Sequence, residues 1–185
     1  MSKIRCSWCE KDDLYRAYHD NEWGRPVHDE RTHFEFLLLE TMQAGLSWYT
    51  ILAKRENYRN AFANFDVNQV VKYTEDDIDK LMQNTGIIRN RRKLEAAVNN
   101  AQKFIQIQQE FGSFDKYIWA FTNNQIIDNH PQTIYDNPNT SELSDRVTKD
   151  LKKRGFKFVG SVTIYSHLQA IGIINDHVAD CWTRK

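Results

Sequence analysis

Glycine and proline are rare in this chain, with seven glycines and three prolines among 185 residues. A sheet-rich domain needs many tight turns, so this scarcity argues against one. Apolar residues instead recur at helical spacings, as at Phe34, Leu37 and Leu38 in the segment that starts at Asp29. The length suits one domain with a buried core. We therefore expect residues 1–185 to form a single all-α domain.

Turn residues and apolar spacing also predict where individual helices lie. We expect a helix that Ser47 caps and that runs through Trp48 and Leu52 toward Phe62, and another that Thr74 caps. Further helices are expected over 94–105 and beyond, ending before Gly112, and over 114–121, 142–153 and 157–170. The stretch 122–141 is rich in Asn, Thr and Pro, which predicts a loop or irregular connection. No pair of strands is evident.

Composition narrows the class of protein. The chain is 41% hydrophobic and 27% charged, which is typical of a globular protein. No apolar run approaches the roughly 20 residues that span a bilayer, and the first residues lack the apolar region of a signal peptide. We expect a cytoplasmic protein that does not bind membranes. The net charge of +0 argues against a general polyanion binder, although a local basic patch can still bind nucleic acid.

Cysteine and histidine gather at the two ends of the chain. Cys6 and Cys9 lie at the start and Cys181 at the end, with His177 four residues before Cys181 and His19 thirteen residues after Cys6. Two thiolates and two imidazoles match a closed tetrahedral zinc site. The spacing leaves open whether Cys9 or His19 completes it, and each residue alone could be an ordinary packed side chain. Such a site would be structural, because four protein ligands leave no position for water.

The segment 84–90 lies between two expected helices and is a candidate DNA-binding element. Its spacing around Gly86 and Ile87, followed by Lys93, fits a helix-hairpin-helix motif over about 75–105. A glycine at positive φ would let backbone N–H groups point outward toward a phosphate, and Arg89 adds positive charge. The alternative is an ordinary helix connection with a glycine cap and solvated basic residues.

Aromatic residues crowd the first third of the chain, and one carboxylate lies among them in the sequence. The aromatic residues are Trp8, Tyr15, Tyr18, Trp23, Phe34, Phe36, Trp48 and Tyr49. Glu40 continues the apolar run 36–39, so its carboxylate is either at the helix surface or buried beside a group that satisfies it. Against an aromatic stack, Glu40 is a candidate for binding a cationic or hydrogen-bond-donating ligand.

Taken together, these segments resemble one family, bacterial 3-methyladenine DNA glycosylase I. They occur in order from end to end: RCSW at 5–8, YRAYHDNEWG at 15–24, ETMQAGLSW at 40–48, KRENYR at 54–59, GIIR at 86–89, KKRGFKFVG at 152–160, and NDHV at 175–178 followed by Cys181. The resemblance implies the helix-hairpin-helix DNA glycosylase fold, with a zinc site that joins the N- and C-termini. It implies one structural zinc held by Cys6, His19, His177 and Cys181, which leaves Cys9 as a free thiol.

The resemblance also implies an activity, the flipping and hydrolytic excision of 3-methyladenine from alkylated double-stranded DNA. Its implied base pocket has Glu40, Tyr18 and Trp48 as catalytic residues and is lined by Tyr15, Trp23 and Trp8. Gly45 and Leu46 match the region that enters the gap left by the flipped nucleotide, and we expect Gly86, Ile87, Arg89 and Lys93 to contact the DNA backbone.

No lysine stands out as a nucleophile, so we expect a monofunctional enzyme without lyase activity. A glycosylase of this size can act as a monomer, and no obligate protein partner is implied. A DNA-binding module without activity would not need Glu40 beside Tyr18 and Trp48. A zinc hydrolase would need an open metal position, which four protein ligands exclude.

Overall fold

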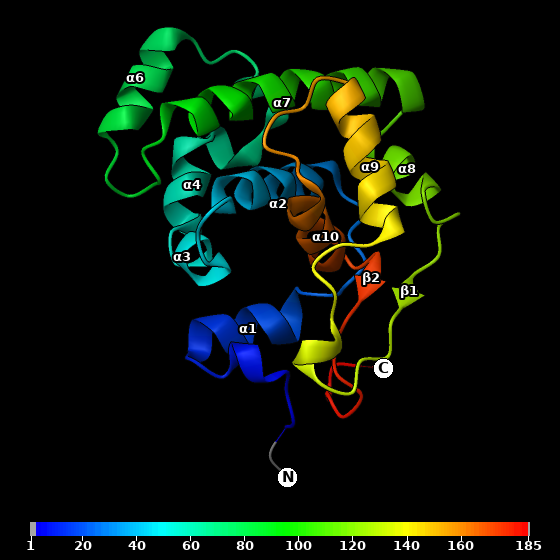
Figure 1. Ribbon diagram of the computed structural model, residues 1–185. Coiled ribbons are helices and arrows are strands. Elements are labelled where there is room, and N and C mark those ends of the chain that lie inside the picture. Colours follow the sequence, from blue (N-terminus) through cyan, green and yellow to red (C-terminus); the bar gives the residue numbers. More distant parts are fainter. Residues whose placement is uncertain (1–2, 185) are drawn as a thin grey trace.

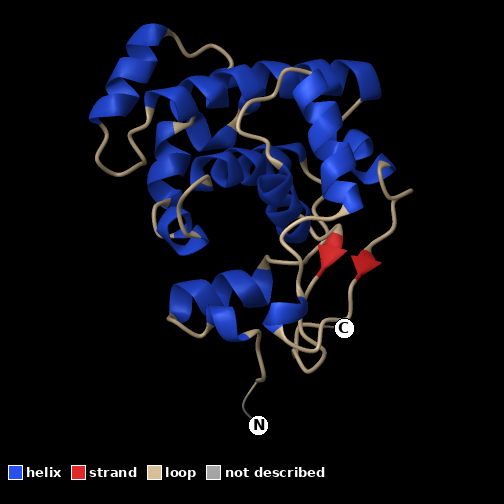
Figure 2. Cartoon of the chain, in the orientation of Figure 1, coloured by secondary structure: helices blue, strands red, loops and turns tan. Residues whose placement is uncertain are grey.

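Helices make up most of residues 3–184, the part of the chain that the computed structural model describes (Figure 2). The α-helices are α1 (Asp13–Asn21), α2 (Glu30–Gln43), α3 (Trp48–Leu52), α4 (Arg55–Ala61), α5 (Val67–Val70), α6 (Glu75–Gln83), α7 (Arg91–Phe111), α8 (Phe114–Ala120), α9 (Glu142–Lys153) and α10 (Ser161–Ala170). Short 3-10 helices are η1 (Ser7–Cys9), η2 (Ala63–Phe65) and η3 (Ile134–Asp136). The prediction of a mainly α-helical fold is confirmed.

Polar caps explain why the helices begin where they do. Ser47 accepts a hydrogen bond from the N–H of Thr50 at the start of α3, as expected. The N–H of Thr74 donates to the Asp77 carboxylate at 3.0 Å, which completes the return half of a capping box at the start of α6. Each cap satisfies donors that the first turn of a helix leaves without partners.

Three sequence expectations differ from the structure in detail. The helix expected from Ser47 toward Phe62 is two helices, and the break turns α4 so that Arg55 reaches Glu35 at 2.6 Å. The last expected helix begins at Ser161 instead of residue 157, after a loop in which Phe158 has a φ of +56°. The stretch 122–141 contains η3 and a two-residue strand.

That strand, β1 (Ile127–Asp128), pairs in parallel with β2 (Ile174–Asn175). Ile127 lies opposite Ile174, and Asp128 lies opposite Asn175. A pair this short leaves no periodic pattern, which is why the sequence does not reveal it. Its effect is to hold the irregular segment 122–141 beside the C-terminal part of the chain (Figure 1).

Helix α2 is the centre of the fold. All ten residues from His33 to Met42 are buried, because α3, α7, α8 and α10 pack around this helix (Figure 1). A helix that is buried on every side belongs to the interior of a protein, and polar side chains on it need a reason to be there. Glu35 and Glu40 are the two carboxylates in this buried stretch.

The two ends of the described chain lie on the same side of the molecule, next to α1 (Figure 1). The N–H of Trp182 donates to the carbonyl oxygen of Ile4 at 3.0 Å. The helices between residues 3 and 184 include none that is long and apolar enough to cross a membrane.

Candidate functional site

A cavity of about 280 Å³ lies where α1, α2, α3 and α10 face one another. Aromatic and polar side chains line it: Trp8, Tyr15, Tyr18, Trp23, Glu40, Gln43, Trp48, Ile134, Asn137, Ser166 and Gln169. All six residues expected to form the base pocket are in this lining. Asn137 and Ile134 come from the irregular stretch 122–141, and Gln43, Ser166 and Gln169 come from helices; the sequence patterns do not single out these five.

Glu40 is the only carboxylate in that lining, and it is 3% exposed. Its Oε2 atom is buried and has no hydrogen-bond partner in the described part of the chain. Burial alone raises the pKa of Glu40 from its ordinary value of 4.5 to about 8. A buried carboxyl without a partner is unfavourable for folding, so it is a candidate for binding a ligand.

The aromatic side chains around Glu40 make the cavity suited to a flat ring. The ring centroids of Tyr18 and Trp48 are 5.3 Å apart, and the indole N–H of Trp48 is buried with no hydrogen-bond partner among the described residues. Trp8 meets Tyr15 edge-on at 4.9 Å and Trp23 edge-on at 5.0 Å. These rings offer apolar faces for stacking and a few polar atoms for orientation, the usual composition of a small-ligand site.

A second cluster of side chains joins the two ends of the chain. Cys6, His19, His177 and Cys181 are all buried, and each offers one ligand atom within 4.8 Å of the others. Cys181 Sγ lies 3.5 Å from both His19 Nε2 and His177 Nδ1, and Cys6 Sγ lies 3.7 Å from His177 Nδ1. This group could hold a metal ion. Cys9 is buried outside it, and burial raises the pKa of its thiol to about 12.

The outer nitrogens of both histidines have partners, which orient the rings toward the cluster. His19 Nδ1 lies 2.9 Å from Asp20 Oδ1, and the guanidinium of Arg5 donates to the same carboxylate. His177 Nε2 lies 3.1 Å from the carbonyl oxygen of Trp23. Partners of this kind commonly fix the orientation of metal-binding histidines.

The cluster and the cavity share a wall. Trp23 meets His177 edge-on at 4.6 Å, and Trp8 meets His19 edge-on at 5.3 Å. Both tryptophans also line the cavity. Any change that loosens the cluster will therefore move one side of the cavity.

The hairpin between α6 and α7 is present, but its N–H groups do not all point outward as expected. The N–H of Gly86 donates to Asn84 Oδ1 at 2.8 Å, and the N–H of Ile88 donates to the Tyr58 hydroxyl at 3.1 Å. Gly86 does not have a positive φ. Glycine is needed at this position because the Cβ of any other residue would lie 2.8 Å from Asn57 Cγ. The Ile87 side chain is buried, while Arg89 is exposed.

Lys93 is also placed differently from the expectation that it contacts DNA. Its side chain is buried, and Nζ donates to the carbonyl oxygens of Met42 at 2.7 Å and Ala44 at 2.6 Å. These carbonyls lie at the C-terminal end of α2, where a cation is favourable. The expectation of a phosphate contact is wrong for this side chain, because its ammonium group already caps α2.

The residues after α2 form an exposed turn at the edge of the cavity. Gly45 has a φ of +79°, a conformation that other residues rarely adopt, and Leu46 is 40% exposed. Gln43 and Trp48, on either side of this turn, both line the cavity. An exposed leucine on a turn next to a cavity is well placed to contact a large ligand.

Comparison with known proteins identifies the relatives of this chain. The methyladenine glycosylase family model matches residues 8–185. The chain is 47% identical over 177 residues to DNA-3-methyladenine glycosylase 1 of Escherichia coli, covering 96% of this chain and 95% of that protein. It is 45% identical to DNA-3-methyladenine glycosylase of Haemophilus influenzae, covering 96% of each.

Solved structures agree with the family match. The fold superposes on that of 3-methyladenine DNA glycosylase I from Staphylococcus aureus with a TM-score of 0.94 at 41% identity, covering 98% of this chain and 96% of the other. A variant of 3-methyladenine DNA glycosylase I in complex with 3-methyladenine gives a TM-score of 0.95 at 40% identity, covering 98% and 97%.

The raised pKa of Glu40 predicts how stability depends on pH. Between pH 4.5 and about 8 the unfolded chain has released this proton while the folded protein keeps it. Stability from this group therefore falls as pH rises, by up to about 1.4 kcal/mol per pH unit. Glutamine does not titrate, so Glu40→Gln should raise the melting temperature over the wild type by an amount that grows from pH 5 to pH 8.

Glu35 provides a matched control on the same helix. Its carboxylate is equally buried but accepts hydrogen bonds from Arg55 at 2.6 Å and Arg59 at 3.1 Å. Glu35→Gln should lower the melting temperature, because it removes the negative charge that two guanidinium groups share. Thermal melts across this pH range test both variants, and a loss of stability in Glu40→Gln at pH 8 would contradict the assignment.

Proposed function

Because this chain belongs to the methyladenine glycosylase family, we propose that it removes 3-methyladenine from alkylated DNA by hydrolysing the N-glycosidic bond. The observation that carries the proposal is the unpartnered carboxyl of Glu40 in an aromatic cavity. The cavity volume of about 280 Å³ is just below the range of sites for drug-sized ligands, about 300–1,000 Å³, which suits a single base.

The target base has to leave the duplex to reach this cavity. Leu46, exposed on the turn after α2, supports the opened stack, and Gly45 gives the turn its shape. The hairpin at 84–90 and the exposed Arg89 grip the DNA backbone, with Gly86 allowing the close turn. In this arrangement Ile87 and Lys93 have structural roles in the interior. Ile87 packs the hairpin against its helices, and Lys93 caps the C-terminal end of α2.

Inside the cavity, recognition relies on the positive charge of the alkylated base. A purine methylated at N3 in DNA is cationic, and stacking on Trp48 is worth roughly 0.5–2 kcal/mol, depending on desolvation. A bound cation favours the ionised form of Glu40, which then accepts hydrogen bonds from the base edge and stabilises the cation with its negative charge. Tyr18 adds a hydrogen bond, while Tyr15, Trp23 and Trp8 complete the wall.

Bond cleavage then needs little acid catalysis. The bond between the sugar C1′ and the base N9 breaks with both electrons moving to the base, which leaves neutral because the methyl group had already made it cationic. Water adds to C1′ and loses a proton. The cavity lining in the described chain contains no lysine, which supports a monofunctional enzyme without a Schiff-base intermediate.

The Cys/His cluster fits a structural zinc ion. In a tetrahedral site with Zn–S near 2.3 Å and Zn–N near 2.0 Å, sulfur and nitrogen lie about 3.5 Å apart. The three sulfur–nitrogen distances of 3.5–3.7 Å agree with this value. Four protein ligands would close the coordination sphere, so the ion would tie the chain ends together and take no part in hydrolysis.

We further assign the chain to the helix-hairpin-helix glycosylases, as one domain in which the hairpin element covers about 75–105. The pairing of α6 with α7 around Gly86 supports this assignment. The substrate partner is double-stranded DNA that contains an alkylated purine.

Base release tests the activity. With duplex DNA that carries 3-methyladenine, the wild type should release the free base without cutting the strand. Glu40→Gln should lower the single-turnover rate by roughly 100-fold or more, because the preorganised carboxylate is lost. Trp48→Ala should also lower it through lost stacking. Asp145→Asn, at an exposed position on α9, is the control and should retain the wild-type rate. Absence of base release by the wild type under all conditions would refute the proposal.

Metal analysis tests the zinc assignment. Each chain should hold one zinc ion, Cys9→Ser should retain it, and His19→Ala should lose or weaken it, since only His19 belongs to the cluster. Elemental analysis of purified protein gives the stoichiometry, and a chelator should lower the melting temperature of the wild type. Zinc loss in Cys9→Ser with retention in His19→Ala would overturn the ligand set.

A further inference from the structure

Helix α2 ends differently from the other α-helices of the described chain. At each of the others, the residue after the helix donates its backbone N–H to a carbonyl oxygen of the last turn, as Glu22 does to Tyr18 after α1. Ala44, the residue after α2, makes no such bond within residues 3–184, and its ψ of 116° takes the chain out of the helix. The last carbonyl groups of α2 therefore need donors from elsewhere in the fold.

Lys93, the third residue of α7, supplies those donors. Its ammonium group donates to the carbonyl oxygen of Met42 at 2.7 Å and to that of Ala44 at 2.6 Å. The side chain is buried, and no carboxylate between residues 3 and 184 forms an ion pair with it. A buried cation without a counter-charge is unfavourable unless its hydrogen bonds are strong, so these two bonds and the negative end of the helix dipole fix its position.

The two carbonyl groups lie on either side of the point where α2 gives way to the turn at 44–46. Gly45 has a φ of +79°, and the N–H of Leu46 donates back to the carbonyl oxygen of Gln43 at 2.6 Å, which leaves the Leu46 side chain exposed. A Cβ at Gly45 would meet no described atom within 4 Å, so the tip of the turn is not held by packing. Lys93 fixes the base of this turn from the interior.

The same lysine directly follows the hairpin at 84–90. Asn90 caps α7, and its side chain accepts a hydrogen bond from the N–H of Lys93 at 3.3 Å. Lys93 therefore connects two segments that the proposed function brings to DNA. Its backbone is tied to the hairpin, and its side chain is tied to the turn, although Lys93 and Met42 are 51 residues apart in the sequence.

This connection concerns the opening of the duplex more than the cavity itself. Leu46 has to reach the base stack while the hairpin holds the backbone, and a misplacement of about 1 Å in such an arrangement can slow a reaction on the order of 100-fold. Glu40 lies one turn earlier in the buried part of α2, and Trp48 belongs to α3, which has its own cap at Ser47. The base-binding groups are thus held independently of the tip of the turn.

We propose that Lys93 is a positioning residue for base flipping: its ammonium group fixes the turn at 44–46, so that Leu46 enters the opened stack while the hairpin holds the backbone. The inference rests on the proposed function, because it takes Leu46 as the side chain that enters the DNA. It separates two properties of the protein, since Lys93 matters for a base inside a duplex and not for a free base.

Two assays on one variant test the proposal. Lys93→Met removes the ammonium group and keeps most of the apolar length of the side chain. Its single-turnover rate of 3-methyladenine release from duplex DNA should fall roughly 10- to 100-fold. Its affinity for free 3-methyladenine, measured by tryptophan fluorescence, should stay at the wild-type value. Lys93→Arg keeps a charged donor and should recover much of the duplex rate.

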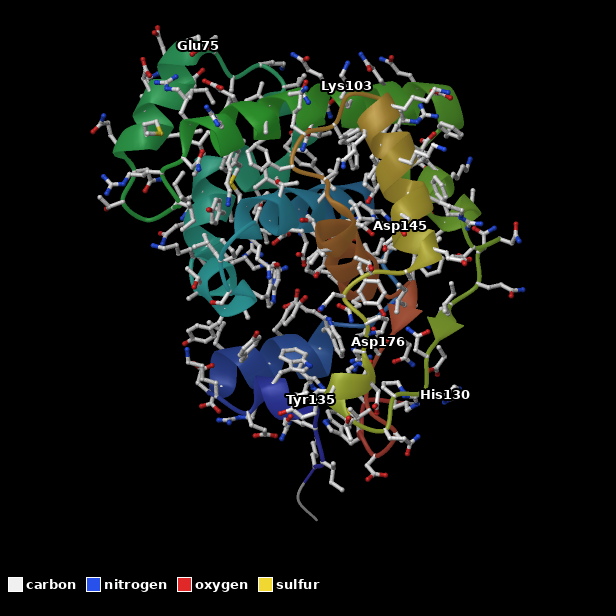
Figure 3. All side chains as sticks on the ribbon, viewed as in Figure 1. Glu75, Lys103, His130, Tyr135, Asp145 and Asp176 are labelled. Carbon is white, nitrogen blue, oxygen red and sulfur yellow. The ribbon has the colours of Figure 1, made fainter. Side chains whose placement is uncertain are left out.

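A double variant shows whether Lys93 acts through the turn. Leu46→Ala should lower the duplex rate, and adding Lys93→Met to it should cause little further loss, because both changes act on one element. Lys103→Met is the matched control. Lys103 lies on the same helix (Figure 3), and its ammonium group donates to the exposed Gln106 side chain at 3.3 Å, so both the duplex rate and the free-base affinity should stay unchanged.

The outcomes keep this proposal apart from the activity. A wild-type duplex rate in Lys93→Met would overturn the positioning role. Equal losses of duplex rate and free-base affinity would also overturn it, because a general loosening of α2 displaces Glu40 as well, and so would additive losses in the double variant. If the wild type neither binds 3-methyladenine nor releases it from DNA, the proposed function itself is wrong. Should Lys93→Met not fold, Lys93→Gln, whose amide can still donate, decides by the same two assays.

Discussion

Closure of the two chain ends around Cys6, His19, His177 and Cys181 is the constraint on which the site depends. It holds α1 against the rest of the molecule, and α1 supplies one wall of the cavity. The tryptophans that pack on the two histidines are the same ones that face the cavity. A fold made mainly of local helices thus depends, at its functional site, on a contact between its most distant residues.

The central helix shows how function and stability compete. Glu35 and Glu40 are both buried on α2, but Glu35 is neutralised by two arginines, while Glu40 has no charged partner between residues 3 and 184. A fold selected for stability alone would place an apolar residue or a counter-charge at position 40. Under the proposed function, a cationic base supplies the missing partner, so the cost of the unpaired carboxyl to the empty protein becomes selectivity when the base binds.

Sequence patterns predict the helices well where apolar spacing and caps agree, as in α9, whose bounds 142–153 match, and in α6 behind Thr74. The positions and contacts of individual polar side chains are harder to predict. Lys93 turns inward because carbonyl groups about fifty residues earlier lie within reach, a contact that local spacing does not encode. Spacing does not distinguish His19 from Cys9 as a member of the cluster, whereas family resemblance favours His19. Asn137 lies in a stretch without any periodic signal.

The distance along the chain between the cluster's first and last residues has a consequence for biosynthesis. Cys6 leaves the ribosome early, whereas Cys181 leaves it near the end, and at roughly 5–20 residues per second this delay is on the order of ten seconds or more. Helices α2, α7 and α8 can form and pack on one another during that interval, whereas α10, which also packs on α2, is made only shortly before Cys181. Helix α1 is synthesised first, but it can be fixed in place only after Cys181 has been made. The cavity is therefore the final part of the protein to take shape, and an incompletely translated chain has no pocket in which to hold a base.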